Sequence, residues 1–147
     1  FDVLLYVLCL IELIGMILFL LIYWPHIPQQ IPMHYDLAGN ISRWGSRKEL
    51  IIFPVMAWIT YLPITLVEHF PEVWNTGVQV TEHNRTLVYS ALFHMFSSLK
   101  FLITCLYTYS ILQTALMLEL PSWFLFAIGA LLCGDIGYWM YRLWKCR

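Results

Sequence analysis

The chain has 147 residues, of which 61% are hydrophobic and only 12% are charged. Soluble domains carry roughly 25% charged residues, so this composition excludes an ordinary soluble domain and indicates an integral membrane protein. The length suits a single domain. The formal net charge of −1 at pH 7 leaves no basic face, which argues against nucleic acid as a partner. The four cysteines have no CxxC spacing, so neither a disulfide framework nor a zinc site is expected.

The first half of the chain holds two apolar runs separated by a loop. Residues 3–23 and 50–67 are each close to the length of about 20 apolar residues that crosses a bilayer core of roughly 30 Å. Between them, residues 25–48 predict a structured loop, and three prolines in its first eight residues hold that start extended and exclude helix there.

The second half predicts a long helix and a fourth span. Residues 70–83 form a second loop, in which 78–81 alternate like a short strand. Residues 84–118 then read as one helix of about 52 Å, which should protrude from the membrane or lie partly in the interface. Its first part, 84–100, is amphipathic, and 101–118 is apolar enough to span. Residues 123–141 form the last span. The predicted fold is therefore all-α: a polytopic membrane protein with four transmembrane helices in one domain.

Four spans place both termini on one side of the membrane. The basic residues near that side outnumber those of the 25–48 loop by five to three: Arg85, Lys100, Arg142, Lys145 and Arg147 against Arg43, Arg47 and Lys48. By the positive-inside rule, the termini are expected inside and the loop outside.

The loop carries the most specific pattern in the chain: Ile27-Pro28, Ile31-Pro32-Met33-His34-Tyr35, Gly39 and Arg43-Trp44-Gly45-Ser46-Arg47. It resembles a bacterial membrane domain of unknown function that forms the front half of the Sdp-type toxin immunity proteins (SdpI). The family pattern is a proline pair, I/V-P-x-H-Y/F, a glycine about five residues on, and W-G-S-K. The resemblance covers roughly residues 20–105. Arg47 stands where the family has lysine, and the second half of the immunity proteins is absent from this chain.

The loop motif supplies the candidate binding residues: Pro32, His34, Tyr35, Asp36, Gly39, Arg43, Trp44 and Gly45. His34 and Asp36 are two apart in an extended segment, so they should face the same way, and the carboxylate could orient the imidazole. The alternative is structural: Trp44 anchors the loop at the interface, and His34 bonds backbone carbonyls. A metal site built from His26, His34 and Asp36 lacks a recognised spacing, and Glu68 and His69 lie about 30 Å away at the opposite face. No metal or cofactor is expected.

Two carboxylates fall inside the spans. Glu12 and Asp135 each cost roughly 2.5–3.5 kcal/mol to insert, so each must face the bundle interior or be protonated. They could share a depth and relay protons or ions. Alternatively, they could be neutral acids bonded to Ser, Thr or Tyr on a neighbouring helix, or could contact another subunit. Lys100, on the order of 14 Å from the midplane, is not expected to partner them. The last span also carries small residues that favour close helix packing: Gly129, Ala130, Gly134 and Gly137.

The chain contains none of the motifs of hydrolases, zinc proteases or P-loop enzymes, so no enzymatic activity is expected. The sequence therefore predicts a non-enzymatic protein of the bacterial cytoplasmic membrane. Embedded in the lipid bilayer, it would act as a binding or accessory protein. Through the 25–48 loop it would engage a membrane-active peptide, a lipid or another membrane protein. The alternative is a component of an ion or proton pathway that uses Glu12 and Asp135.

Overall fold

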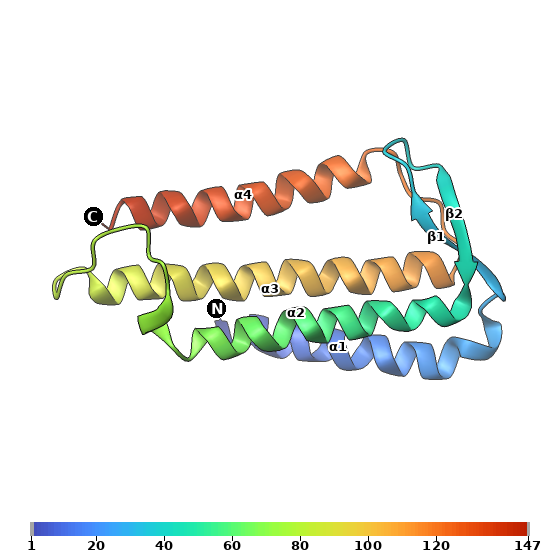
Figure 1. Cartoon of the computed structure of the whole chain (residues 1–147), viewed down its shortest axis with the longest axis horizontal. Coiled ribbons are helices and arrows are strands. Elements are labelled where there is room, and N and C mark those ends of the chain that lie inside the picture. The colour runs from blue at the N-terminus through green and yellow to red at the C-terminus, as the bar shows by residue number, and fades with distance from the viewer. Residues whose placement is uncertain (1, 147) are drawn as a thin grey trace.

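The computed structural model describes residues 2–146; Phe1 and Arg147, the latter counted above among the basic residues, lie outside this range. Four helices run side by side along the long axis of the molecule (Figure 1): α1 (Asp2–Tyr23), α2 (Ile52–Glu68), α3 (Arg85–Ala115) and α4 (Phe124–Trp144). All four are long and apolar enough to cross a membrane. The predicted all-α, four-span architecture is confirmed.

Helix α3 is the centre of the bundle, because it packs against α1, α2 and α4 (Figure 1). Its main core partner is a stripe on α1 at helical spacing, Cys9, Leu13, Met16 and Leu20, all of which are buried. The first part of α3 does not project freely from the bundle. Val88 and Leu92 lie in a second buried cluster with Leu143 of α4.

The α3 helix ends at Ala115, three residues before the predicted boundary, in a Schellman motif. The Leu118 amide donates to the Gln113 carbonyl oxygen, and the Met117 amide donates to that of Thr114. Met117 takes the left-handed position of this motif, with φ of 54°. A side chain there costs about 1–2 kcal/mol, which is why glycine normally occupies it.

Met117→Gly should therefore stabilise the protein by about 1 kcal/mol. Met117 is 41% exposed, so its removal sacrifices little packing. The measurement is the free energy of unfolding in detergent. The control is Leu116→Gly at the preceding residue, whose φ of −90° gives glycine no advantage and which should lose stability. A loss for Met117→Gly as large as that of the control would contradict the prediction.

Short elements connect the helices. A 3-10 turn, Trp24–His26, covers the start of the 25–48 segment, so the expectation of no helix there is wrong. Pro25 lies in the first positions of this turn, where a backbone N–H has no partner within the turn and its absence costs nothing. A two-stranded antiparallel hairpin follows, β1 (Gln30–Tyr35) and β2 (Ile41–Ser46), which the sequence did not predict. A second 3-10 helix, Arg47–Ile51, leads into α2.

The connection between α2 and α3 lies at the opposite end of the bundle (Figure 1). It holds a 3-10 turn, Pro71–Val73, but no strand at 78–81, so that prediction is wrong. The buried Asn84 organises this segment: its amide nitrogen donates to the carbonyls of Gln79 and Cys146, each at 3.0 Å. The loop is thereby tied to the end of α4.

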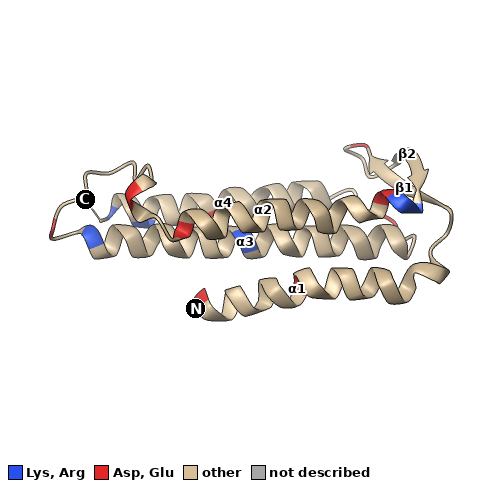
Figure 2. Ribbon diagram, turned by 60° about the horizontal axis from the view of Figure 1, so that its bottom comes forward, with Lys and Arg blue, Asp and Glu red and all other residues tan. Residues whose placement is uncertain are grey.

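Helix α4 packs on α3 and leaves most of its other faces exposed. A methyl group added at Gly129, Gly134 or Gly137 would meet nothing within 4 Å. The close packing predicted from these small residues is therefore not made within the described part of this chain. Charged residues gather at the two ends of the bundle, with few along its length (Figure 2), as expected for helices that cross a bilayer.

Candidate functional site

The hairpin caps the end of the bundle where α1 ends and where α3 turns into α4 (Figure 1). In its register Pro32 pairs with Trp44, and His34 pairs with Arg43, so that Met33 is bulged out of the ladder. Strand β1 faces inward: Ile31 and Pro32 are buried. Every residue of β2 except Gly45 is exposed. The hairpin therefore has a packed strand and an outward-facing strand.

Asp36 builds the turn of the hairpin and does not orient His34, so that prediction is wrong. Its Oδ1 accepts hydrogen bonds from the backbone amides of Ala38 and Asn40, each at 2.9 Å. The Asn40 side-chain amide donates to Oδ2 at 3.1 Å. These bonds, led by that of the Asn40 side chain, hold the pKa of Asp36 below its ordinary value of 3.8. His34 instead pairs with Ser42: its Nδ1 lies 2.7 Å from the Ser42 hydroxyl.

The turn of the hairpin rests against the α3–α4 connection. Gly39 has φ of 86°, and a Cβ there would lie 2.5 Å from the Leu120 carbonyl oxygen. Nearby, the Gln113 side-chain amide of α3 donates to the Tyr35 hydroxyl at 2.6 Å and also bonds the Leu118 carbonyl. Tyr35 and Gly39 therefore belong to the docking side of the hairpin.

Arg47 fixes the hairpin to the end of α1, a role that the sequence pattern did not reveal. Its Nη1 donates to the carbonyl oxygens of Trp24 and Ile27, each at 3.2 Å. Its guanidinium also lies 5.2 Å from the centroid of the Trp24 ring. Both hydrogen bonds come from one nitrogen while the planar guanidinium lies near the indole ring, an arrangement that suits Arg.

Glu49 ties strand β2 to the 3-10 helix that follows it. Its Oε1 accepts from the Ser46 amide at 2.8 Å in a capping box, and its Oε2 accepts from Arg43 Nη2 at 2.9 Å. A Cβ on Gly45 would lie 2.5 Å from Oε1 and 2.6 Å from Met33, so any larger residue would have to displace one of these side chains. The capping pattern Ser46-x-x-Glu49 is visible in the sequence and is the signal that could have identified Glu49.

The outer face that remains is exposed and chemically mixed. Trp44 is 51% exposed, His34 and Arg43 are exposed beside it, and Leu37 and Ile41 add apolar surface near the turn. Tyr35, Asp36, Gly39 and Gly45 maintain the frame. The predicted eight-residue set thus divides into a supporting group, which also includes the buried Pro32, and an exposed group of His34, Arg43 and Trp44.

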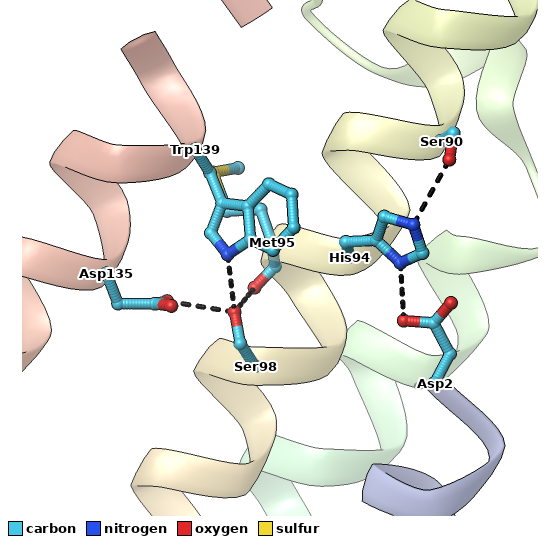
Figure 3. Close-up of polar contacts among 7 residues, drawn as sticks. All are labelled: Asp2, Ser90, His94, Met95, Ser98, Asp135 and Trp139. Carbon is cyan, nitrogen blue, oxygen red and sulfur yellow. Dashed lines mark hydrogen bonds and ion pairs between the residues drawn. The ribbon is translucent and has the colours of Figure 1, made fainter. Parts of the chain in front are cut away.

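The intramembrane acids have separate partners on α3. Asp135 Oδ2 accepts from the Ser98 hydroxyl at 3.0 Å, and Trp139 donates to the same hydroxyl (Figure 3). The Cys105 thiol donates to Glu12 Oε1 at 2.9 Å. Because Ser98 and Cys105 are seven residues apart on one helix, the acids differ in depth by about 10 Å. The prediction of a shared depth is wrong.

A buried ion pair joins α2 to α3. Lys100 Nζ lies 2.6 Å from Glu68 Oε2, with both side chains at most 5% exposed. The ammonium also donates to the Thr65 hydroxyl at 3.2 Å and lies 5.1 Å from the centroid of the Tyr61 ring. Lys100 is therefore not bonded to Glu12 or Asp135, as expected. Its pairing with Glu68 was not predicted.

A further polar contact ties the start of α1 to α3. His94 Nδ1 lies 2.7 Å from Asp2 Oδ1, and its Nε2 lies 3.2 Å from the Ser90 hydroxyl (Figure 3). Asp2, Glu68 and Lys100 all line a cavity of about 330 Å³ between α1, α2 and α3. Within residues 2–146, no three His, Cys, Asp or Glu side chains come together as a metal-binding group.

The helices and the hairpin define an integral membrane protein with a β-capped four-helix bundle. Residues 11–57, which cover the second half of α1, the hairpin and the start of α2, match the family described as "Domain of unknown function (DUF1648)". An uncharacterized protein of Archaeoglobus fulgidus is 32% identical over 66 residues, which cover 40% of this chain. The chain spans 36% of the length of that relative. No solved structure matches this chain significantly.

Proposed function

We propose that this protein is a non-enzymatic binding protein of the bacterial cytoplasmic membrane that recognises a membrane-active peptide or another membrane protein through the hairpin. The observation that carries this proposal is the exposed group of His34, Arg43 and Trp44 on a hairpin that other residues fix to the bundle. Loops that present side chains from a rigid scaffold are typical binding sites.

The rigidity of the hairpin supports this role. It is attached to α1 through Arg47, to α3 through Tyr35 and Gln113, and to the α3–α4 turn through Gly39. A surface that is already ordered loses little conformational entropy when a partner binds, so more of the contact energy appears as affinity.

The chemistry of the exposed group supports it as well. Tryptophan and arginine are enriched among the side chains that dominate binding energy. Arg43 uses Nη2 for Glu49, which leaves further N–H donors of its guanidinium for an acceptor on the partner. Strand β2 pairs only with β1 among the described residues, so its other edge offers backbone groups to an extended peptide segment. The resemblance of the loop to the immunity proteins supports a peptide as that partner.

Single substitutions on the hairpin test this proposal. We expect Arg43→Ala and Trp44→Ala each to lower partner recovery at least about fivefold, because dominant interface residues contribute more than about 1 kcal/mol. His34→Ala should have a smaller effect, since its ring is already bonded to Ser42. Tagged full-length variants are purified in mild detergent, and each co-purifying chain is quantified against wild type by mass spectrometry.

The matched controls lie at the other end of the molecule. Arg142→Ala and Trp144→Ala remove the same two residue types from exposed positions on α4 and should leave recovery unchanged. If the hairpin and α4 variants recover every partner equally, the hairpin is not the recognition surface.

A proton or ion pathway through Glu12 and Asp135 is the alternative that the sequence suggests. The two acids bond different residues of α3, about 10 Å apart along its axis. Asp135 accepts a hydrogen bond from a serine on a neighbouring helix, as expected of a carboxyl group that stabilises helix packing. These contacts favour the binding role over a relay.

A further inference from the structure

An apolar groove lies between α1 and α2 on the half of the bundle next to the hairpin. It has a volume of about 730 Å³, within the range of ligand sites in proteins. All nine side chains that line it are aliphatic, proline or tryptophan. Ile17 and Leu21 contribute from α1, and Val55 and Ile59 from α2, while Trp24 and Trp58 supply its two aromatic walls.

The mouth of the groove at the hairpin end is basic. The Arg47 guanidinium lies 5.2 Å from the centroid of Trp24, a groove residue. Lys48 belongs to the 3-10 helix Arg47–Ile51. Side chains three residues apart lie on the same side of such a helix, so Lys48 is on the same side as Ile51, which lines the groove. Lys48 is exposed and forms no ion pair within residues 2–146.

No acidic side chain at this end cancels these two cations. Glu49 is neutralised by Arg43 at 2.9 Å. Asp36 lies in the turn of the hairpin, which rests on Leu120 through Gly39. Glu119 is the residue before Leu120 in the chain. These two carboxylates therefore belong to the α3–α4 side of the hairpin end. The mouth between α1 and α2 keeps an excess of positive charge.

We propose that this groove holds an acyl chain of an anionic phospholipid, with the lipid phosphate at Lys48 and Arg47. The groove lies in helices that cross the membrane, so acyl chains are its natural surroundings. Besides the two indole N–H groups, its lining offers nothing that could satisfy the backbone of an extended peptide. Basic residues at the membrane surface select anionic headgroups, and Trp24, at the end of the first span, matches the interfacial level of such a headgroup. This site is separate from the exposed group of His34, Arg43 and Trp44 and does not depend on the proposed recognition function.

Lipid titration of the purified full chain tests the proposal. Native mass spectrometry in detergent measures the binding of phosphatidylglycerol and of phosphatidylcholine with the same acyl chains. We expect one phosphatidylglycerol to bind in preference to phosphatidylcholine. Lys48→Gln should weaken that binding about fivefold, the factor that one basic residue contributes near a membrane surface. Val55→Phe fills the groove from an exposed position and should abolish the preference.

The controls separate the headgroup, the groove and general damage. Lys145→Gln and Val7→Phe make the same changes at exposed positions outside the groove and should bind lipid as wild type does. Melting temperatures without added lipid, unchanged by Lys48→Gln and Val55→Phe, show that the variants are folded. Equal binding of the two lipids, unchanged binding by Lys48→Gln, or competition by glycerol phosphate alone would each overturn the proposal.

Discussion

Lys100→Met should destabilise the bundle by about 3–5 kcal/mol, because it leaves the Glu68 carboxylate buried without its cation. Both side chains of this pair are at most 5% exposed. The other Glu68 oxygen, Oε1, has no hydrogen-bond partner in residues 2–146, so nothing else there compensates the charge. The measurement is the free energy of unfolding in detergent.

A second variant separates the charge from the packing. Lys100→Met combined with Glu68→Leu removes both ions and should recover most of the loss, since apolar replacement of a whole buried pair is often neutral or stabilising. Lys145→Met, at an exposed lysine, should change stability by less than about 0.5 kcal/mol. A double variant as unstable as Lys100→Met alone would show that burial of the unpaired carboxylate is not the cause.

Gly39→Ala should displace the hairpin from the α3–α4 connection. The substitution meets two costs: about 1–2 kcal/mol for a side chain in the left-handed region, and a contact of 2.5 Å with the Leu120 carbonyl oxygen. Backbone on both sides leaves no flexible group to move aside. We expect a total loss of about 2–5 kcal/mol, since forced overpacking adds roughly 1–3 kcal/mol. Unfolding in detergent measures the loss, and limited proteolysis of the hairpin reports its displacement.

Two other glycines provide the reference. Gly77 has φ of 65°, but its Cβ would meet nothing within 4 Å, so Gly77→Ala should show the conformational cost alone. Gly134→Ala, in open space on a helix, should be neutral or stabilise by up to about 1 kcal/mol. If Gly39→Ala costs no more than Gly77→Ala, the hairpin does not rest on Leu120.

The four helices were predictable because long apolar runs have few other structures available to them in a membrane. The hairpin was not predictable, because its strands are short and a bulge at Met33 breaks the alternation that identifies strands in sequence. The wrong prediction for His34 and Asp36 has a different cause. The strand ends at Tyr35, so Asp36 belongs to the turn and faces its backbone amides.

The sequence singled out residues of the hairpin but did not predict what each of them contacts. Arg43 and Trp44 are exposed on β2, and His34 is exposed on β1. Arg47 and Glu49, which hold the hairpin in place, gave only weak signals. The ion pair of Lys100 and Glu68 joins residues 32 positions apart on two helices. Such pairs depend on the rotation of each helix about its axis, which spacing within one helix cannot supply.

The docking of the hairpin also constrains the order in which the protein can be completed. Tyr35 precedes its partner Gln113 by 78 residues, and Gly39 meets a backbone oxygen beyond the end of α3. During synthesis the hairpin therefore emerges before the surface on which it rests. It can adopt its full set of contacts only after α3 has been inserted and the chain has turned toward α4. The fully docked hairpin is thus a late event of assembly, and a chain truncated before Leu120 would lack the backbone against which Gly39 rests.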